Sequence, residues 1–212
     1  MVTVLIIRHG FSRGNKENRF SGQMDVPLDE TGILQARATA EYILSHFKVD
    51  SVYSSDLSRA VDTVKPIADA LGLSVHTCKD LREVGVGDWQ DRTNEEIAKL
   101  YPESIETYRK TPGLTRFDGG ESFMEAQERS LRAIERIAAE NEGKTVVIGT
   151  HGGNIRALQV AWMGKSMAQM QEVPYVPNCA VTVVNYENGK AEILLSGYAD
   201  HLTEKTELVD VQ

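Results

Sequence analysis

The sequence predicts an α/β domain in which a mainly parallel central sheet lies between two layers of helices. Strand-like runs alternate with segments of helical periodicity over most of the chain, which is typical of such folds. The runs at Val2–Ile7 and 144–150 consist almost wholly of apolar and β-branched residues, as in strands covered on both faces. Asn188-Gly189 joins two further strand-like runs and predicts a hairpin. We therefore expect a three-layer sandwich with an antiparallel hairpin at one edge.

The first 80 residues alternate between strand and helix twice. After the run at Val2–Ile7, apolar residues recur at three- and four-residue steps from Ile33 to Phe47, which predicts an amphipathic helix. A second helix begins near Leu57 and stops at Gly72. Short β-favouring runs at Ser51–Ser54 and 74–77 flank this second helix and predict two more strands.

The periodic pattern weakens between Leu81 and Gly120. This stretch holds a Gly- and Trp-containing loop, one helix opened by the capping-box spacing of Thr93 and Glu96, and a polar segment with a proline at 111–120. We interpret it as a lid or insertion over the sheet. The chain as a whole, 1–212, is expected to form a single domain.

Regular structure is expected again from about Ser122, where Ser122 and Glu125 have capping-box spacing and a long helix follows through Ile137. A strand at 144–150 then leads through a turn into a helix that begins with HGGNIRAL. The runs 180–186 and 191–197 form the terminal hairpin. Its outer strand could pair across a homodimer.

Composition excludes several classes of protein. The net charge of −8 and the lack of a Lys/Arg block argue against nucleic-acid and membrane-surface partners, although a small anionic substrate remains compatible with it. Cys78 and Cys179 have no metal-ligand spacing, so neither a disulfide framework nor a zinc site is expected. With no leader pattern and no apolar stretch of about 20 residues, the sequence predicts a soluble, cytoplasmic protein.

Polar residues gather where three of the predicted strands end. The first strand ends in Arg8-His9-Gly10, the strand at 144–150 is followed by His151 and two glycines, and the helix after the strand at 51–54 carries Arg59 in its first turn. Ligands bind beyond the carboxyl ends of such strands. If the three strands are neighbours, two imidazoles and two guanidinium groups converge at one edge of the sheet.

This set of side chains fits phosphoryl transfer. Guanidinium groups hold phosphate oxygens in pairs, and nearby arginines lower the pKa of an imidazole so that it can attack phosphorus. A second, protonated imidazole would donate to the same oxygens. Glu83, on a glycine-containing loop, is the candidate proton donor, and the sequence leaves its protonation state open. No carboxylate cluster suggests a metal site.

Each candidate also has a structural alternative. A single histidine at a strand end is usually a packed, hydrogen-bonded residue, Arg59 could pair with carboxylates on its helix, and Glu83 alone would be a surface carboxylate. Two His-Gly turns after two apolar strands favour the functional interpretation for His9 and His151.

Six segments in order resemble the signatures of the histidine phosphatase superfamily, in the branch with cofactor-dependent phosphoglycerate mutase and its phosphatase relatives: RHGFSRGN, RFSGQMDVPLDETGILQA, VYSSDLSRAVDT, LREVGVGDW, FDGGES and TVVIGTHGGNIRAL. The resemblance implies that His9 is the phosphorylated nucleophile and Glu83 the proton donor. It further implies that the phosphate pocket is formed by Arg8, Arg59 and His151 and lined by Asn15, Ser21 and the Gly22 backbone.

The resemblance implies a metal-independent phosphatase that acts on a small phosphorylated metabolite. EVGVGDW and the short stretch to Gly120 are similar to the phosphatase branch, whereas Ser21 is closer to the mutases. The alternative is therefore a glycolytic phosphoglycerate mutase, an isomerase primed by 2,3-bisphosphoglycerate. Its substrate carboxylate could then be clamped by Arg92, Arg109, Lys110 and Arg116. A third possibility is a non-catalytic module that binds a phosphorylated ligand.

Overall fold

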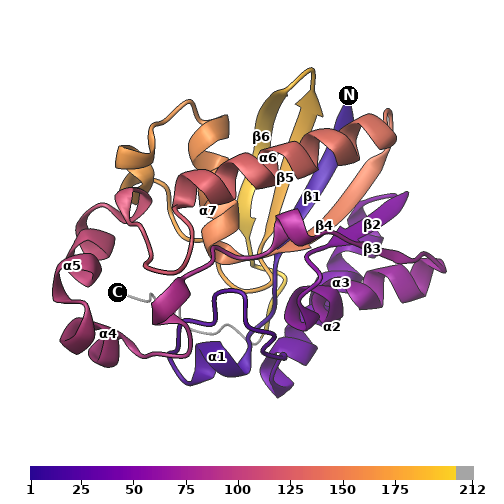
Figure 1. Ribbon diagram of the computed structural model, residues 1–212. Coiled ribbons are helices and arrows are strands. Elements are labelled where there is room, and N and C mark those ends of the chain that lie inside the picture. Colours follow the sequence, from indigo (N-terminus) through magenta and orange to yellow (C-terminus); the bar gives the residue numbers. More distant parts are fainter. Residues whose placement is uncertain (204–212) are drawn as a thin grey trace.

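The computed structural model describes residues 1–203, in which six strands form one mixed sheet flanked by helices (Figure 1). The strand order is β3-β2-β4-β1-β5-β6, where β3, β2, β4 and β1 are parallel and β5 and β6 are antiparallel to their neighbours. The predicted fold class is therefore confirmed. The strands are β1 Val2–Arg8, β2 Ser51–Ser54, β3 Val75–Thr77, β4 Thr145–Thr150, β5 Val181–Glu187 and β6 Lys190–Tyr198.

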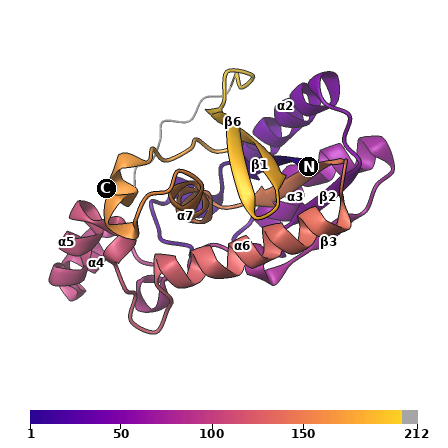
Figure 2. The same cartoon turned by 90° about the horizontal axis from the view of Figure 1, so that it is seen from above.

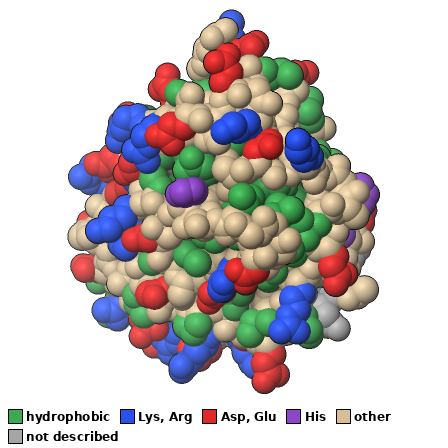
Figure 3. All heavy atoms as spheres, turned by 90° about the vertical axis from the view of Figure 1, so that its right-hand side faces the viewer, with side chains coloured by type: hydrophobic (Ala, Val, Ile, Leu, Met, Phe, Trp, Pro, Cys, Tyr) green, Lys and Arg blue, Asp and Glu red, His purple; other side chains and the backbone are tan. Residues whose placement is uncertain are grey.

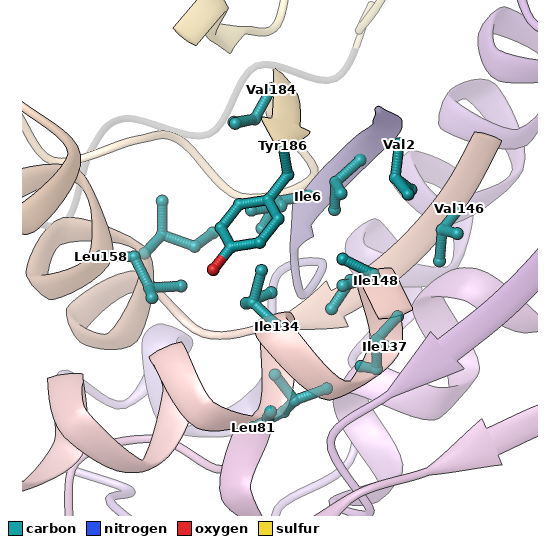
Figure 4. Packing of buried hydrophobic residues seen from close by; sticks show 14 of the residues in the cluster. Val2, Ile6, Leu81, Ile134, Ile137, Val146, Ile148, Leu158, Val184 and Tyr186 are labelled. Carbon is teal, nitrogen blue, oxygen red and sulfur yellow. The ribbon is translucent and has the colours of Figure 1, made fainter. Parts of the chain in front are cut away.

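Alternate residues of the central strands pack against helices on opposite faces of the sheet. Val4 and Ile6 of β1 lie in one core cluster with α6 (Phe123–Glu140) and α7 (Gly152–Trp162). Leu5 and Ile7 lie in another with α2 (Glu30–His46) and α3 (Ser58–Leu71). Figure 2 shows α6 and α2 on opposite sides of the strands, and Figure 4 shows the first cluster. Burial on both faces fixes the carboxyl ends of β1 and β4 rigidly.

Local signals set the ends of these helices as the sequence predicts. The side chain of Ser122 accepts a hydrogen bond from the Glu125 N–H and completes the expected capping box of α6. Gly72 ends α3 in the left-handed conformation, with φ of 66°. Asn188 and Gly189 both have positive φ, 51° and 74°, as a two-residue hairpin turn requires.

The segment 81–120 contains more helix than the sequence predicts. Thr93 caps α4 (Asn94–Leu100) as expected, but α5 (Pro102–Lys110) follows directly where no helix was predicted. Only Ile105 of α5 is fully buried, so the apolar period is too short to detect. Two short helices, α1 (Arg13–Lys16) and the 3₁₀ helix η4 (Met167–Glu172), were missed for the same reason. The segment also holds the 3₁₀ turns η2 Gly87–Trp89 and η3 Pro112–Leu114, and η1 Lys79–Leu81 leads into it.

A second apolar cluster joins this segment to the body of the protein. Trp89, Ile97, Ile105 and Phe117 from the segment pack with α6, α7 and η4. Trp89 makes edge contacts with Phe20, Tyr108 and Phe117 at centroid distances of 5.0 to 5.6 Å. This cluster lies beyond the carboxyl ends of the strands and forms one wall of the cavity described below.

The surface mixes charges of both signs. Figure 3 shows Lys/Arg and Asp/Glu side chains interspersed over one face of a chain whose net charge is −8. Within residues 1–203 no helix has the length and apolar character needed to cross a membrane. The hairpin lies at the sheet edge with β6 outermost, and pairing of two chains through this edge stays a prediction.

Candidate active site

The three strand ends that carry the predicted site residues are adjacent. β4 lies between β2 and β1, and Arg8 is paired in register with Thr150, so His9 and His151 follow neighbouring strands at the same level. Their ring centroids are 5.2 Å apart. A cavity of about 750 Å³ opens above them, lined by seven of the eight predicted site residues: Arg8, His9, Asn15, Ser21, Gly22, Arg59 and Glu83. His151 lies against His9 and is fully buried.

Hydrogen bonding determines which nitrogen of His9 is available. Nδ1 lies 2.8 Å from the carbonyl oxygen of Gly10, and a carbonyl can only accept, so Nδ1 carries the proton. In the neutral ring Nε2 then holds the lone pair. Burial, followed by the charges of Arg59 and Arg8, lowers the pKa of His9 well below its usual value. His9 therefore presents an unprotonated nitrogen at neutral pH, as the sequence analysis expected.

His151 differs from the expectation of a protonated imidazole. Its Nε2 lies 2.8 Å from the Ser55 hydroxyl, and its Nδ1 is buried with no partner among residues 1–203. Burial and then the charge of Arg59 lower the pKa of His151 well below its usual value. The surroundings thus favour the neutral form, which still has one N–H to donate.

Arg8 and Arg59 are positioned by backbone carbonyls rather than by carboxylates. Arg8 donates to the carbonyl oxygen of Val176 at 2.6 Å, and Arg59 donates to those of Met24 and Gly22 at 2.7 and 2.8 Å. Burial lowers the pKa of Arg59 to about 10, so it remains charged at neutral pH. Both side chains are nearly fully buried, and their charges are left for an anion in the cavity.

Helix α1 and the loop that follows it supply the other lining residues. Asn15 accepts hydrogen bonds from Ser12 through Oδ1, at 3.1 Å from the backbone N–H and 2.9 Å from the hydroxyl, which leaves its amide N–H groups for the cavity. Gly22 has a φ of 47°, and a Cβ there would lie 2.6 Å from a methyl carbon of Val86. Glycine is therefore required for the turn whose carbonyl receives Arg59.

Glu83 extends to the N-terminus of α7. Its Oε1 accepts from the backbone N–H groups of Val84 and Asn154 at 2.9 and 3.0 Å, and its Oε2 from that of Gly153 at 3.1 Å. A Cβ on Gly153 would lie 2.8 Å from Oε1, so only glycine allows this approach. Oε2 makes one of these bonds and Oε1 two, so Oε2 is the oxygen with room for a proton or a ligand.

A partly buried ion pair holds the Glu83 loop in place. Arg129 on α6 donates to the backbone carbonyls of Asp80, Arg82 and Glu83 at 2.7 to 2.9 Å, and pairs with the carboxylate of Glu121 at 2.6 Å. The guanidinium group thus spans the turn that leads into Glu83. Removing one partner of this pair would leave the other charge partly buried and uncompensated.

Four supporting residues were missed by sequence reasoning. Ser55 and Glu121 lie inside two of the quoted motifs, so a signal for them existed. Arg129 and Asn178 give no local signal in the sequence. In the structure the Asn178 amide donates to the carbonyl of His9 at 2.9 Å. Of the four residues suggested for a carboxylate clamp, only Arg109 lines the cavity.

Acidification is expected to destabilise the fold through His9 and His151. An imidazole in the unfolded chain takes up a proton near pH 6.5, whereas both folded-state pKa values lie well below that. Between these pH values the unfolded state binds more protons, so the free energy of unfolding falls with pH by up to about 1.4 kcal/mol per unit for each imidazole. Urea unfolding at about pH 7.5 and 5.5 should show this loss. An equal loss of unfolding free energy in a His9→Asn variant would contradict the contribution assigned to His9.

Carboxylates near the site do not gather into a metal site. Within residues 1–203 no group of three or more His, Cys, Asp or Glu side chains lies close enough to hold an ion. Glu83 is the one acidic residue among those described that line the cavity.

Comparisons with known proteins agree with this geometry. A sequence profile of the histidine phosphatase superfamily (branch 1) matches residues 4–198. Phosphoglycerate mutase-like protein 4 of Arabidopsis thaliana is 34% identical over 209 residues, covering 95% of this chain and 87% of the relative. The metal-independent phosphoserine phosphatase of the same plant is 34% identical over 189 residues, covering 88% and 77%. The structure of Bacillus stearothermophilus YhfR superposes with a TM-score of 0.90 at 28% identity, covering 95% of this chain and 99% of that one.

Proposed function

The chain belongs to the histidine phosphatase superfamily (branch 1), and from this we propose that it is a phosphatase that cleaves small phosphorylated metabolites through a phosphohistidine at His9. Membership confirms the resemblance inferred from the six motifs. The observation that most supports the proposal is the unprotonated Nε2 of His9, whose Nδ1 donates to the Gly10 carbonyl. The same cavity holds the buried guanidinium groups of Arg8 and Arg59, neither of which pairs with a carboxylate of residues 1–203.

In the first step, Nε2 of His9 attacks the phosphorus of a bound monoester. The P–N bond forms as the P–O bond to the alcohol breaks, and the alcohol oxygen takes the electron pair and a proton from Glu83. The imidazole becomes positively charged, and its Nδ1–H stays on the Gly10 carbonyl. Arg8 and Arg59 stabilise the negative charge on the phosphoryl oxygens, and Asn15 and His151 each offer an N–H.

In the second step, water replaces the alcohol. The Glu83 carboxylate takes a proton from water, the water oxygen attacks phosphorus, and the P–N bond breaks with its electron pair returning to Nε2. Phosphate leaves, and Glu83 is again protonated for the next cycle. The backbone N–H groups of Val84, Gly153 and Asn154 hold the carboxylate in one position through both steps.

Activity is expected to be independent of metal ions and sensitive to vanadate. The name of the Arabidopsis phosphoserine phosphatase supports metal independence, and the buried arginines supply the positive charge that a metal would otherwise give. Hydrolysis of p-nitrophenyl phosphate should therefore be unchanged by EDTA. Vanadate, which takes up five-coordinate geometry, should inhibit competitively. Loss of activity with EDTA that Mg²⁺ or Zn²⁺ restores would refute metal independence.

The alternative function for this site is that of a phosphoglycerate mutase. One relative, from Gloeobacter violaceus, is named a 2,3-bisphosphoglycerate-dependent phosphoglycerate mutase. The enzyme is supplied with 3-phosphoglycerate and 2,3-bisphosphoglycerate as primer. Release of phosphate without 2-phosphoglycerate supports the phosphatase, whereas 2-phosphoglycerate formation faster than phosphate release supports the mutase. A phosphohistidine that forms and never turns over would support the non-catalytic module.

We further propose that segment 81–120 acts as a lid. The lining of the cavity includes Val84, Val86, Tyr108 and Phe117 from this segment, which supports that role. The cytoplasmic location stays a prediction.

A further inference from the structure

The two arginines of the phosphate pocket are held differently. Arg59 donates through both Nη1 and Nη2 to backbone carbonyls, so two hydrogen bonds fix the plane of its guanidinium group. Among residues 1–203, Arg8 donates only through Nη1, to the carbonyl of Val176 at 2.6 Å, and its buried Nε has no hydrogen-bond partner. One hydrogen bond fixes one nitrogen and leaves the plane able to turn about it. The orientation of Arg8 therefore depends on a further contact.

The ring of Tyr175 supplies this contact. The guanidinium carbon of Arg8 lies over the ring, 5.2 Å from its centroid. A cation at this distance is attracted by the negative face of an aromatic ring, and the attraction grows where the pair is removed from water. Arg8 is nearly fully buried. The ring thus holds the guanidinium group without accepting a conventional hydrogen bond from it, and the N–H groups of Arg8 not bound to Val176 remain for phosphate oxygens.

Tyr175 contacts Arg8 as a neutral ring. Burial raises the pKa of Tyr175 well above its usual value, so its hydroxyl is protonated at neutral pH. The contact is therefore not an ion pair between a tyrosinate and a guanidinium group. A phenylalanine ring at the same position would preserve it.

The ring is itself held in place from a second side. The carbonyl of Val173 accepts from Nε of Arg156 at 2.7 Å, and the guanidinium carbon of Arg156 lies 5.4 Å from the centroid of the Tyr175 ring. Arg156 belongs to α7, whereas Arg8 ends β1. The segment 173–176 is thus attached to both elements, with Tyr175 between the two carbonyls that accept from the arginines.

The turn after His151 leaves room for this arrangement. A Cβ on Gly152 would overlap with Cε1 of Tyr175 and would lie 3.0 Å from Nε of Arg8. Glycine at this position therefore allows the ring and the guanidinium group to pack against the turn. The two glycines of the turn serve different side chains, since Gly153 admits Glu83.

We propose that Tyr175 is a positioning residue of the phosphate pocket, whose ring fixes the guanidinium group of Arg8 in the orientation that receives phosphate oxygens. The hydroxyl of Tyr175 is not needed for this role. The inference rests on the proposed phosphatase activity and adds a residue on which that activity depends. Without the ring, Arg8 keeps its charge and loses the direction of its hydrogen bonds.

Two substitutions of Tyr175 test the role of the ring. Tyr175→Leu keeps an apolar side chain without the ring, and Tyr175→Phe keeps the ring. In Tyr175→Leu the Kd for inorganic phosphate, measured by titration calorimetry, should rise about tenfold, and kcat/KM for p-nitrophenyl phosphate should fall by about tenfold or more, as expected when one charge-assisted hydrogen bond is misdirected. In Tyr175→Phe both should stay within about threefold of the wild type.

Tyr198→Leu is the matched control. Tyr198 is a half-buried tyrosine whose ring packs on Tyr42, and it does not line the cavity. This variant should keep the wild-type Kd and kcat/KM. If Tyr175→Leu does not fold, Tyr175→Met replaces it in both measurements.

A double-mutant cycle shows whether the ring acts through Arg8. In an Arg8→Gln background, Tyr175→Leu should change the Kd for phosphate by less than about twofold, because there is no guanidinium group left to orient. A loss of the same size in both backgrounds, no loss in Tyr175→Leu alone, or a tenfold loss in Tyr175→Phe overturns the proposal.

Phosphate binding requires no turnover, so the two proposals fail in different ways. A wild-type protein that binds phosphate but does not hydrolyse p-nitrophenyl phosphate refutes the phosphatase, and the cycle then still decides whether Tyr175 orients Arg8. If the wild type neither binds phosphate nor hydrolyses the ester, both proposals are wrong.

Discussion

Replacing His9 by asparagine is expected to reduce phosphatase activity by roughly four orders of magnitude or more, the scale seen when an enzyme loses its nucleophile. The asparagine amide can occupy the place of Nδ1 and donate to the Gly10 carbonyl, but it has no atom at Nε2. The variant thus keeps a hydrogen bond to the Gly10 carbonyl and lacks the attacking nitrogen. Steady-state hydrolysis of p-nitrophenyl phosphate measures the loss.

Two controls separate loss of chemistry from loss of fold. Inorganic phosphate should still protect His9→Asn against thermal unfolding, because Arg8, Arg59 and Asn15 remain. His46→Asn replaces an exposed histidine on α2 and should retain full activity. Activity of His9→Asn within tenfold of the wild type would show that another group attacks phosphorus.

Replacing Glu83 by glutamine is expected to slow the first step according to the leaving group. An alkoxide needs a proton as it leaves, whereas p-nitrophenolate does not. For an alkyl phosphate, kcat/KM should fall by roughly 10² to 10⁴, the contribution of a positioned general acid. For p-nitrophenyl phosphate it should change by less than about tenfold, because kcat/KM covers only the steps up to the first irreversible one.

The same variant should also accumulate phosphoenzyme. Glutamine cannot take a proton from water, so hydrolysis of the P–N bond slows even where its formation does not. A burst of p-nitrophenol, equal in amount to the enzyme and followed by slow turnover, is the expected time course. Glu121→Gln is a useful comparison, because Glu121 supports the Glu83 loop through Arg129 without lining the cavity. An equal loss for both leaving groups in Glu83→Gln would contradict its role as acid.

The part of the candidate site at the strand ends could be predicted from the sequence. His9 and His151 are each the first polar residues after buried strands, and Arg59 opens the helix after a third strand. In a parallel sheet those positions meet at one edge whatever the details of packing. Strand order was the one condition left open, and the observed order β2-β4-β1 satisfies it.

The rest of the site depends on contacts between residues that are far apart in the chain. Arg129 reaches a turn more than forty positions earlier, and Arg156 is oriented by the Val173 carbonyl and the Tyr175 ring. No local pattern distinguishes these arginines from surface ones. Helix α5 was likewise missed because one buried isoleucine gives no measurable period.

The tautomer of His9 and the charge of His151 could not be predicted from the sequence. The Gly10 carbonyl selects the tautomer of His9, and burial lowers the pKa of His151 below the range in which a sequence argument expected it to be charged. Both effects come from how tightly β1 and β4 are enclosed, which composition alone does not reveal.

The passage of the phosphoryl group through Nε2 of His9 is tested most directly in Glu83→Gln mixed with p-nitrophenyl phosphate. The reaction is stopped in alkali, in which phosphohistidine survives, and the phosphoryl group is located by peptide mass spectrometry. We expect one phosphoryl group per chain, on His9, in step with the released p-nitrophenol. Stoichiometric release of p-nitrophenol with His9 unmodified would contradict a phosphohistidine mechanism.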